Sequence, residues 1–159
     1  MKITILAVGH LKEAYWKAAS DEYIKRLSAY ANVSIIEVDD LPSKEKAGEA
    51  NETKVKNEEG AKLLSKIKPG DYVCALDLDK KEMDSVSFSS HLEEMMVRGG
   101  SAVIFLVGGS LGLSDEVKKR ANESISFSKM TFTHQMSRII LLEQLYRAYK
   151  LAHHEPYHK

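Results

Sequence analysis

The chain has 159 residues, of which 43% are hydrophobic and 29% charged. This length is typical of one domain, so we expect residues 1–159 to form a single domain, and the composition excludes collagen-like, low-complexity and broadly disordered proteins. The 23 basic and 23 acidic side chains cancel, which argues against a protein that coats nucleic acid by bulk electrostatics.

Short runs of β-branched residues alternate with longer polar and apolar stretches, the pattern of an α/β domain. Strands are predicted, in chain order, at residues 3–8, 33–38, 72–78, 102–107 and 124–127. Helices are predicted at residues 13–30, 44–67, 87–98, 115–121 and 134–151. The runs at 73–78 and 103–107 are almost continuously apolar, which is typical of central parallel strands in a sheet with helices on both faces.

Two side chains are predicted to cap helices. Ser114 precedes two acidic residues, and Thr133 precedes the last helix. The apolar residues of that last helix cover more than one stripe, so we expect it to pack on two sides, against its own sheet and against a second subunit. The alternative is a central helix wrapped wholly by its own chain.

No apolar run approaches the ~20 residues needed to cross a bilayer, and the opening MKITILAVGHLKE reaches charge too soon for a secretory signal peptide. We therefore expect a cytoplasmic protein without a membrane partner. Cys74 is the only cysteine and lies in an apolar run, so a disulfide framework and a cysteine zinc site within the chain are excluded. A buried, inert thiol is expected.

Three strand ends form a candidate pocket, because ligands of open parallel sheets lie outside the carboxyl ends of the strands. They are the segments 76–79, 107–112 and 127–132. In the second segment, Gly108, Gly109 and Gly112 would let the backbone approach a ligand closely, although a plain tight turn is the alternative. The glycines match neither the P-loop nor the G-x-G-x-x-G pattern.

Two other chemistries find little support. No G-x-S-x-G elbow precedes His134, so a nucleophilic triad is not expected. His154 and His158 have a spacing that could bind zinc on a helix, but Pro156 between them should break that helix. No metal site is expected.

The residues from 129 onward carry five basic side chains against two acidic ones, a local charge of +3. The segment 153–159 adds imidazoles and an aromatic ring, a combination that can stack on bases and hold phosphates of RNA. An anionic partner is one interpretation, and a solvated helix face followed by a ragged terminus is the other.

Five segments carry a resemblance to a known family. They are MKITILAVGHLK at the start, FLVGGSLGL at 105–113, SFSKMTFTH at 126–134, EQLYRAY at 143–149 and PYHK at 156–159. Together they resemble, essentially end to end, the small SPOUT methyltransferases of the RlmH type. The resemblance implies an α/β fold, with a SPOUT-type parallel sheet and a C-terminal trefoil knot.

The resemblance also implies a homodimer that methylates N3 of a pseudouridine in 23S (large-subunit) ribosomal RNA, on the assembled ribosome, with S-adenosyl-L-methionine. Position by position, it places the cofactor contacts on the three strand ends already named, at Leu76, Gly108, Phe127, Ser128, Lys129, Met130, Thr131 and Phe132. An apolar slot for adenine could come from five residues there, namely Leu76, Leu106, Phe127, Met130 and Phe132.

The acceptor nitrogen must lose its proton, so a base or a stabilising charge would help. The catalytic candidates are Arg138, His134, Tyr157 and His158, with no residue declared as the base. The RNA-binding candidates are Arg138, Arg147, His154, Tyr157, His158 and Lys159. Some relatives carry arginine in place of Lys159, so a forked phosphate contact there is in doubt.

Two other functions compete with the methyltransferase. One is a catalytically silent ribosome-binding module that kept the fold, which would bind no cofactor. The other is a different small-molecule α/β enzyme, which would bind a cofactor but ignore RNA. Cofactor binding and dependence on residues 153–159 separate the three hypotheses.

Overall fold

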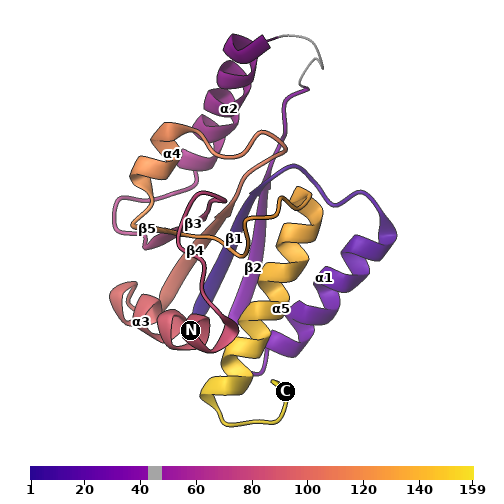
Figure 1. Cartoon of the computed structure of the whole chain (residues 1–159), viewed down its shortest axis with the longest axis vertical. Helices are drawn as coiled ribbons and strands as arrows, with labels where there is room; N and C mark the ends of the chain where they lie inside the picture. Colours follow the sequence, from indigo (N-terminus) through magenta and orange to yellow (C-terminus); the bar gives the residue numbers. More distant parts are fainter. Residues whose placement is uncertain (43–47) are drawn as a thin grey trace.

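The computed structural model describes residues 1–42 and 48–159, in which strands and helices alternate (Figure 1). The strands are β1 (Lys2–Val8), β2 (Asn32–Val38), β3 (Val73–Leu76), β4 (Ala102–Val107) and β5 (Glu123–Ile125). The helices are α1 (Ala14–Leu27), α2 (Gly48–Leu64), α3 (Ser85–Arg98), α4 (Asp115–Arg120) and α5 (His134–Ala152).

The strands form one parallel sheet in the order β2-β1-β4-β3-β5. The two apolar runs of the sequence become β3 and β4, which lie inside the sheet as predicted, with β4 between β1 and β3. Since every strand points the same way, all their carboxyl ends meet at one edge. That edge is where the sequence places the candidate pocket.

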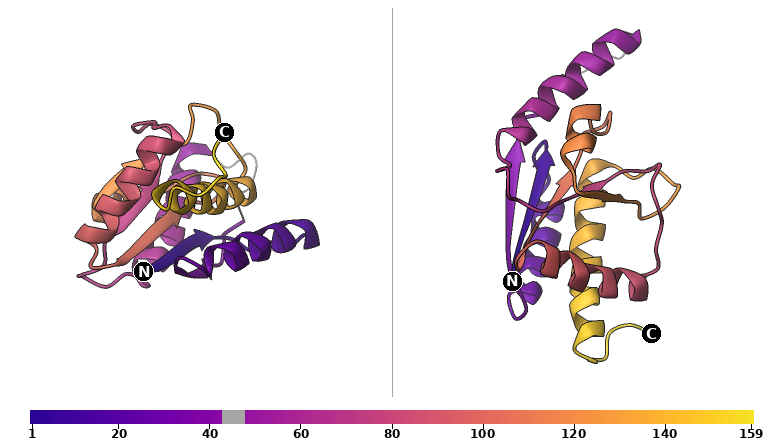
Figure 2. Two further views of the ribbon diagram at one scale, coloured as in Figure 1. Left: turned by 90° about the horizontal axis from the view of Figure 1, so that it is seen from below. Right: turned by 90° about the vertical axis from the view of Figure 1, so that its left-hand side faces the viewer.

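Helices cover both faces of the sheet, as predicted (Figure 2). On one face, alternate residues such as Ile5 and Phe105 pack with buried side chains of α1, α3 and α5. On the other face, their neighbours Leu6 and Leu106 pack with Leu63 of α2 and with α4. The alternation follows from the two-residue period of a strand, and it yields two apolar layers with the sheet between them.

Several element boundaries differ from the sequence predictions by two or three residues, and the first helix ends at Leu27 rather than at residue 30. The third strand ends at Leu76 rather than at 78, because the chain turns at residues 78–79, after the N–H of Asp77 has made a last bond to β5 at the carbonyl of Ile125. The fifth strand ends at Ile125, which leaves Ser126 and Phe127 in the following loop. Of the helix predicted at 44–67, residues 44–47 lie outside the described residues, and α2 ends at Leu64.

Both predicted helix caps are confirmed. The Ser114 hydroxyl accepts the N–H of Val117 at 3.3 Å, and the Thr133 hydroxyl accepts the N–H of Met136 at 3.3 Å. The cap of α3 was missed: the Asp84 carboxylate accepts the N–H of Ser87 at 2.7 Å, so α3 begins two residues before the predicted start. Such caps satisfy N–H groups that have no partner inside the helix.

One apolar face of helix α5 packs within its own chain. Leu141, Leu142, Leu145 and Ala148 are buried in the layer that α5 shares with the sheet, α1 and α3. Met136 is 39% exposed, and Ile139 and Ile140 are half-buried, so the helix keeps apolar surface outside that layer. The homodimer and the trefoil knot stay predictions.

Cys74 is fully buried in β3, which confirms the predicted buried thiol. Burial raises the pKa of this thiol far above its ordinary value, so it stays protonated and unreactive. Within residues 1–42 and 48–159, no helix is long and apolar enough to cross a membrane.

Candidate active site

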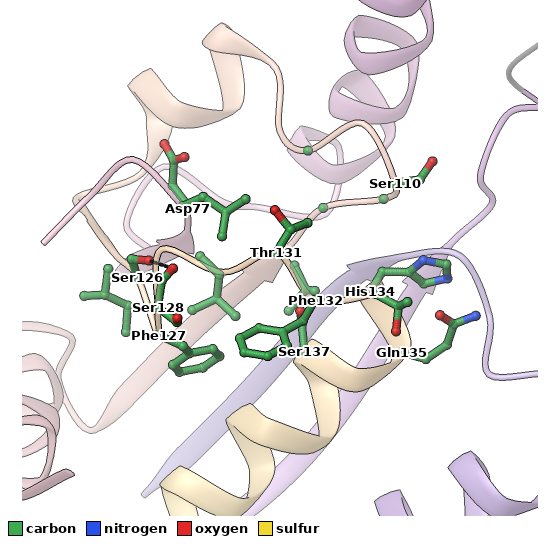
Figure 3. Close-up of a pocket in the computed structure, with 18 residues that line it drawn as sticks. Asp77, Ser110, Ser126, Phe127, Ser128, Thr131, Phe132, His134, Gln135 and Ser137 are labelled. Carbon is green, nitrogen blue, oxygen red and sulfur yellow. Dashed lines mark hydrogen bonds between the residues drawn. The ribbon is translucent and has the colours of Figure 1, made fainter. Parts of the chain in front are cut away.

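A cavity of about 490 Å³ opens at the carboxyl edge of the sheet (Figure 3). The loops that follow β3, β4 and β5 line it, together with the first turn of α5. The three strand ends named from the sequence thus meet in one place. The volume lies within the range of ~300–1,000 Å³ that is common for small-molecule sites.

The loop after β4 folds back tightly on itself. Gly112, with φ of +83°, donates its N–H to the carbonyl of Gly109 at 3.0 Å. A Cβ atom on Gly108 would lie 2.8 Å from the carbonyl carbon of Gly112, closer than real Cβ contacts allow. Gly108 is therefore required for the close approach of two backbone segments at the cavity wall.

The loop after β5 presents two aromatic rings to the cavity. Phe127 and Phe132 both line it, and hydroxyl groups fix the backbone between them. Ser126 donates its hydroxyl to the carbonyl of Ser128 at 2.9 Å, and the Ser128 hydroxyl accepts the N–H of Met130 at 3.0 Å. The loop is thereby bent around the cavity with its rings inward (Figure 3).

Six of the eight expected cofactor residues line the cavity, namely Leu76, Gly108, Phe127, Ser128, Thr131 and Phe132. Lys129 and Met130 are not among the lining residues, and the side chain of Met130 is 73% exposed. The expected adenine slot needs two corrections: Met130 faces solvent, and Leu106 is buried in the layer on the α2 side of the sheet. Val107 and Ile125 supply apolar lining instead.

These residues fit an adenosine-type cofactor. Apolar walls suit a planar base, and the glycine loop leaves room for a ligand to approach backbone groups. Asp77 also lines the cavity, but its side chain turns toward α4, where one carboxylate oxygen lies 3.2 Å from the Lys118 ammonium (Figure 3). That oxygen is buried and receives no well-aligned hydrogen bond, so the contact is an ion pair by distance only.

The first turn of α5 forms the side of the cavity opposite Asp77 and Ser126 (Figure 3). It contributes His134, Gln135 and Ser137. The imidazole of His134 lies against the backbone of Gly9, since a Cβ there would be 3.4 Å from its Nε2. Burial, and then the charge of Arg138, lower the pKa of His134 below 6.5, which leaves the ring neutral at pH 7.

Arg138 does not face the cavity. Its side chain is fully buried, donates to the carbonyls of Val8 at 3.1 Å and Gly9 at 2.5 Å, and pairs with the Glu37 carboxylate at 2.5 Å. The predicted contacts of Arg138 with substrate or RNA phosphate are therefore corrected, because its guanidinium is committed to its own chain and closed to solvent.

Glu37 also holds His10, and so joins Arg138 to a surface network. The two ring nitrogens of His10 lie 2.6 Å from Glu37 and 2.7 Å from Asp39. Hydrogen bonds to Asp39 and Glu37 raise the pKa of His10, and the Asp39 pKa falls in turn. The loop after β1 is thereby tied to the end of β2.

The predicted RNA-binding residues gather at the other end of α5. The Arg147 guanidinium pairs with Glu143 at 2.5 Å and stacks 4.7 Å from the centre of the Tyr157 ring, while the Tyr157 hydroxyl donates to Glu143 at 3.2 Å. His158 lies 3.4 Å from Arg147, and His154 and Lys159 are exposed. Residues 153–159 therefore form an ordered tail folded against α5.

This placement separates the catalytic candidates. His134 begins α5 at the cavity, whereas the tail leaves the last turn of the same helix and folds back, so that Tyr157 reaches Glu143, about 14 Å along the axis from His134 (Figure 1). Tyr157 and His158 therefore do not lie beside His134 within one chain. Their catalytic role, with the tail reaching the pocket across a dimer, stays a prediction.

Comparison with known proteins adds the family. The family model described as "Predicted SPOUT methyltransferase" matches residues 1–158. The chain belongs to the SPOUT methyltransferases. Proteins called "Ribosomal RNA large subunit methyltransferase H" from Clostridium botulinum (strain Eklund 17B / Type B) and Exiguobacterium sp. (strain ATCC BAA-1283 / AT1b) are each 50% identical to it. Both matches cover 100% of this chain and of the relative.

In this SPOUT methyltransferase, five cavity residues were not predicted from the sequence as part of the pocket, namely Ile125, Ser126, Thr133, Gln135 and Ser137. The predicted cap at Thr133 was the available signal, because a helix that starts at the carboxyl edge of a sheet turns its first residues toward the ligand site. Metal binding finds no geometric support in the described ranges, where no group of three or more metal-binding side chains occurs.

The His10 bridges predict a pH-dependent stability. Below pH 6.5, the ordinary pKa of histidine, the ring is protonated in both states and the bridges contribute fully. As the pH rises through the raised pKa of the folded state, His10 loses its proton and that contribution disappears. The stability advantage of wild type over His10→Gln should therefore shrink in urea unfolding as the pH rises above about 6.5. A constant advantage would contradict the assignment.

Proposed function

We propose that this SPOUT methyltransferase uses S-adenosyl-L-methionine to methylate N3 of a pseudouridine in 23S ribosomal RNA of the large subunit. The cavity carries the proposal, because residues that the resemblance assigns to the cofactor converge on one apolar site of suitable size. The names of the 50% identical relatives support the RNA substrate. An enzyme with this substrate works where ribosomal subunits are, so we also propose a cytoplasmic location.

The cofactor supplies, when bound, a methyl group on a positively charged sulfur, which keeps the electron pair of the broken bond. The N3 nitrogen uses its own electron pair for the new bond to carbon, and its proton must leave. Phe127 and Phe132 would hold the adenine, while the turn at Gly108 would hold the donor at bonding distance from the base. Positioning of this kind supplies much of the rate of such displacements.

His134 is the proposed proton acceptor. It is the catalytic candidate from the sequence that lines the cavity, and its lowered pKa keeps an acceptor nitrogen free at neutral pH. Tyr157 and His158 are proposed instead as RNA contacts in the tail, with Arg147, His154 and Lys159.

A homodimer is proposed on the same geometry. Since the tail and the cavity lie at opposite ends of α5, two chains with antiparallel α5 helices would bring the tail of one to the cavity of the other (Figure 1). The cavity rim offers apolar surface for such contacts, because Met130 is 73% exposed and Met136 39% exposed.

The direct test is transfer of labelled methyl to ribosomes that lack the mark, followed by mass spectrometry of the nucleosides. We expect label in large-subunit RNA, as a methylpseudouridine. Label in a small molecule but not in RNA would favour the rival enzyme. Absence of cofactor binding in calorimetry would favour the silent ribosome-binding module.

Removing Tyr157, His158 and Lys159 should abolish transfer to ribosomes and leave cofactor affinity unchanged. This short deletion keeps Glu155, which binds Tyr30 at 2.7 Å and pairs with Lys150, so the remaining tail stays anchored. Transfer is measured with labelled cofactor and affinity by calorimetry. Lys80→Ala, on the loop after β3, is the matched control for loss of one exposed cation. Full transfer by the truncated chain would contradict the tail's role.

A further inference from the structure

We propose that the buried pair of Arg138 and Glu37 is a positioning device for His134, which holds the imidazole against the loop after β1 in the uncharged form that can accept the N3 proton. The inference rests on the proposed function. Arg138, whose guanidinium is buried and so does not contact substrate or RNA, thereby has an indirect role in the same reaction.

Both side chains of α5 contact the same residue of that loop. His134 and Arg138 are four residues apart, so they lie on one face of the helix, one turn from each other. The Arg138 guanidinium donates to the Gly9 carbonyl at 2.5 Å, and the imidazole packs on Gly9 from the cavity side. Gly9 has φ of +85°, a conformation that other residues rarely adopt, and its N–H donates to the carbonyl of Val38.

Glu37 completes the arrangement from β2. It accepts from Arg138 at 2.5 Å and from His10 at 2.6 Å, so Glu37 ties the loop after β1 both to β2 and to α5. The position of His134 therefore depends on three elements that meet at Gly9.

The charges around His134 favour the same role. Desolvation at the cavity wall, and then the charge of Arg138 on the same helix, lower the pKa of His134. Asp40 after β2 and Glu13 at the start of α1 raise it. Since Asp40 and Glu13 are exposed and Arg138 is fully buried, solvent screens the two carboxylates more strongly than the guanidinium.

The test compares wild type with two variants. Arg138→Met/Glu37→Gln removes both charges and fills similar space, a replacement that folded proteins often tolerate. Glu37→Gln alone keeps an acceptor for Arg138 but leaves the guanidinium without a countercharge. NMR titration of the His134 ring, assigned with His134→Asn, reports its protonation without cofactor or RNA. Rates of methyl transfer to ribosomes against pH report the reaction.

We expect the two variants to move His134 in opposite directions. Its titration midpoint should rise toward 6.5 in the double variant, which removes the Arg138 charge that lowers the His134 pKa. It should fall in Glu37→Gln, because the guanidinium then lacks its countercharge, and the acid limb of the rate profile should move with the midpoint. A merely structural pair would lower stability in both variants and leave the midpoint unchanged, which would overturn the inference.

The reaction arm separates this inference from the proposed function. Wild type that transfers no methyl at any pH would overturn the proposed function, and with it the role of His134. Transfer whose acid limb is the same in all three proteins would overturn only the positioning role of Arg138 and Glu37. Should the double variant not fold, the Glu37→Gln titration still decides, because an unmoved midpoint contradicts the coupling.

Discussion

Arg138→Ala is expected to lower the free energy of unfolding by about 3–5 kcal/mol, the usual cost of removing one partner of a buried ion pair. The guanidinium is fully buried and bridges Glu37 on β2 with the carbonyls of Val8 and Gly9 after β1. Its loss would leave a partly buried carboxylate and two carbonyls without their donor. Urea unfolding at pH 7 gives the measurement.

The matched control is Arg26→Ala, which makes the same substitution at an arginine that forms an exposed pair with Glu22 on α1. Such surface pairs contribute little, so this variant should unfold almost like wild type. If Arg138→Ala were as stable as Arg26→Ala, the buried network could not hold α5 to the sheet in the manner described.

Gly108→Ala is expected to weaken S-adenosylmethionine binding at least about tenfold, or ~1.4 kcal/mol. The added Cβ would lie 2.8 Å from the Gly112 carbonyl carbon and 3.0 Å from its oxygen. Since both neighbours are backbone atoms, the loop after β4 must shift, and the cavity wall shifts with it. Calorimetry with the cofactor measures the loss, and circular dichroism shows that the sheet remains.

Gly70→Ala serves as the control, because a Cβ there meets nothing within 4 Å and the backbone has no unusual φ. This variant should bind the cofactor like wild type. Equal affinity of the Gly108 and Gly70 variants would mean that the loop after β4 does not shape the site.

The order and type of the elements were predictable because local patterns determine them. Continuous apolar runs identified β3 and β4 as interior strands, and Ser114 and Thr133 marked helix starts that the structure confirms. Strand ends were less predictable, since β3 stops where Asp77 binds Ile125, a residue almost fifty positions away. The partners of α5 within the chain were unpredictable for the same reason, since α1 and α3 are distant in sequence.

The site was predictable in part. Strand ends of a parallel sheet converge by topology, so Leu76, Gly108 and Phe127 could be grouped from the sequence. The burial of Arg138 could not, because a basic residue on a helix is usually exposed and its partner Glu37 lies on another strand. The separation of the tail from the cavity follows from the length and direction of α5, which the sequence gives only once the sheet is oriented.

The central claim is that the cavity at the carboxyl edge of the sheet binds S-adenosylmethionine. Titration of the ¹⁵N-labelled protein with this cofactor tests it most directly. We expect the largest amide shifts in residues 76–78, 108–112 and 126–133, which line the cavity or adjoin its lining. Saturating cofactor that leaves those segments unshifted would contradict the account.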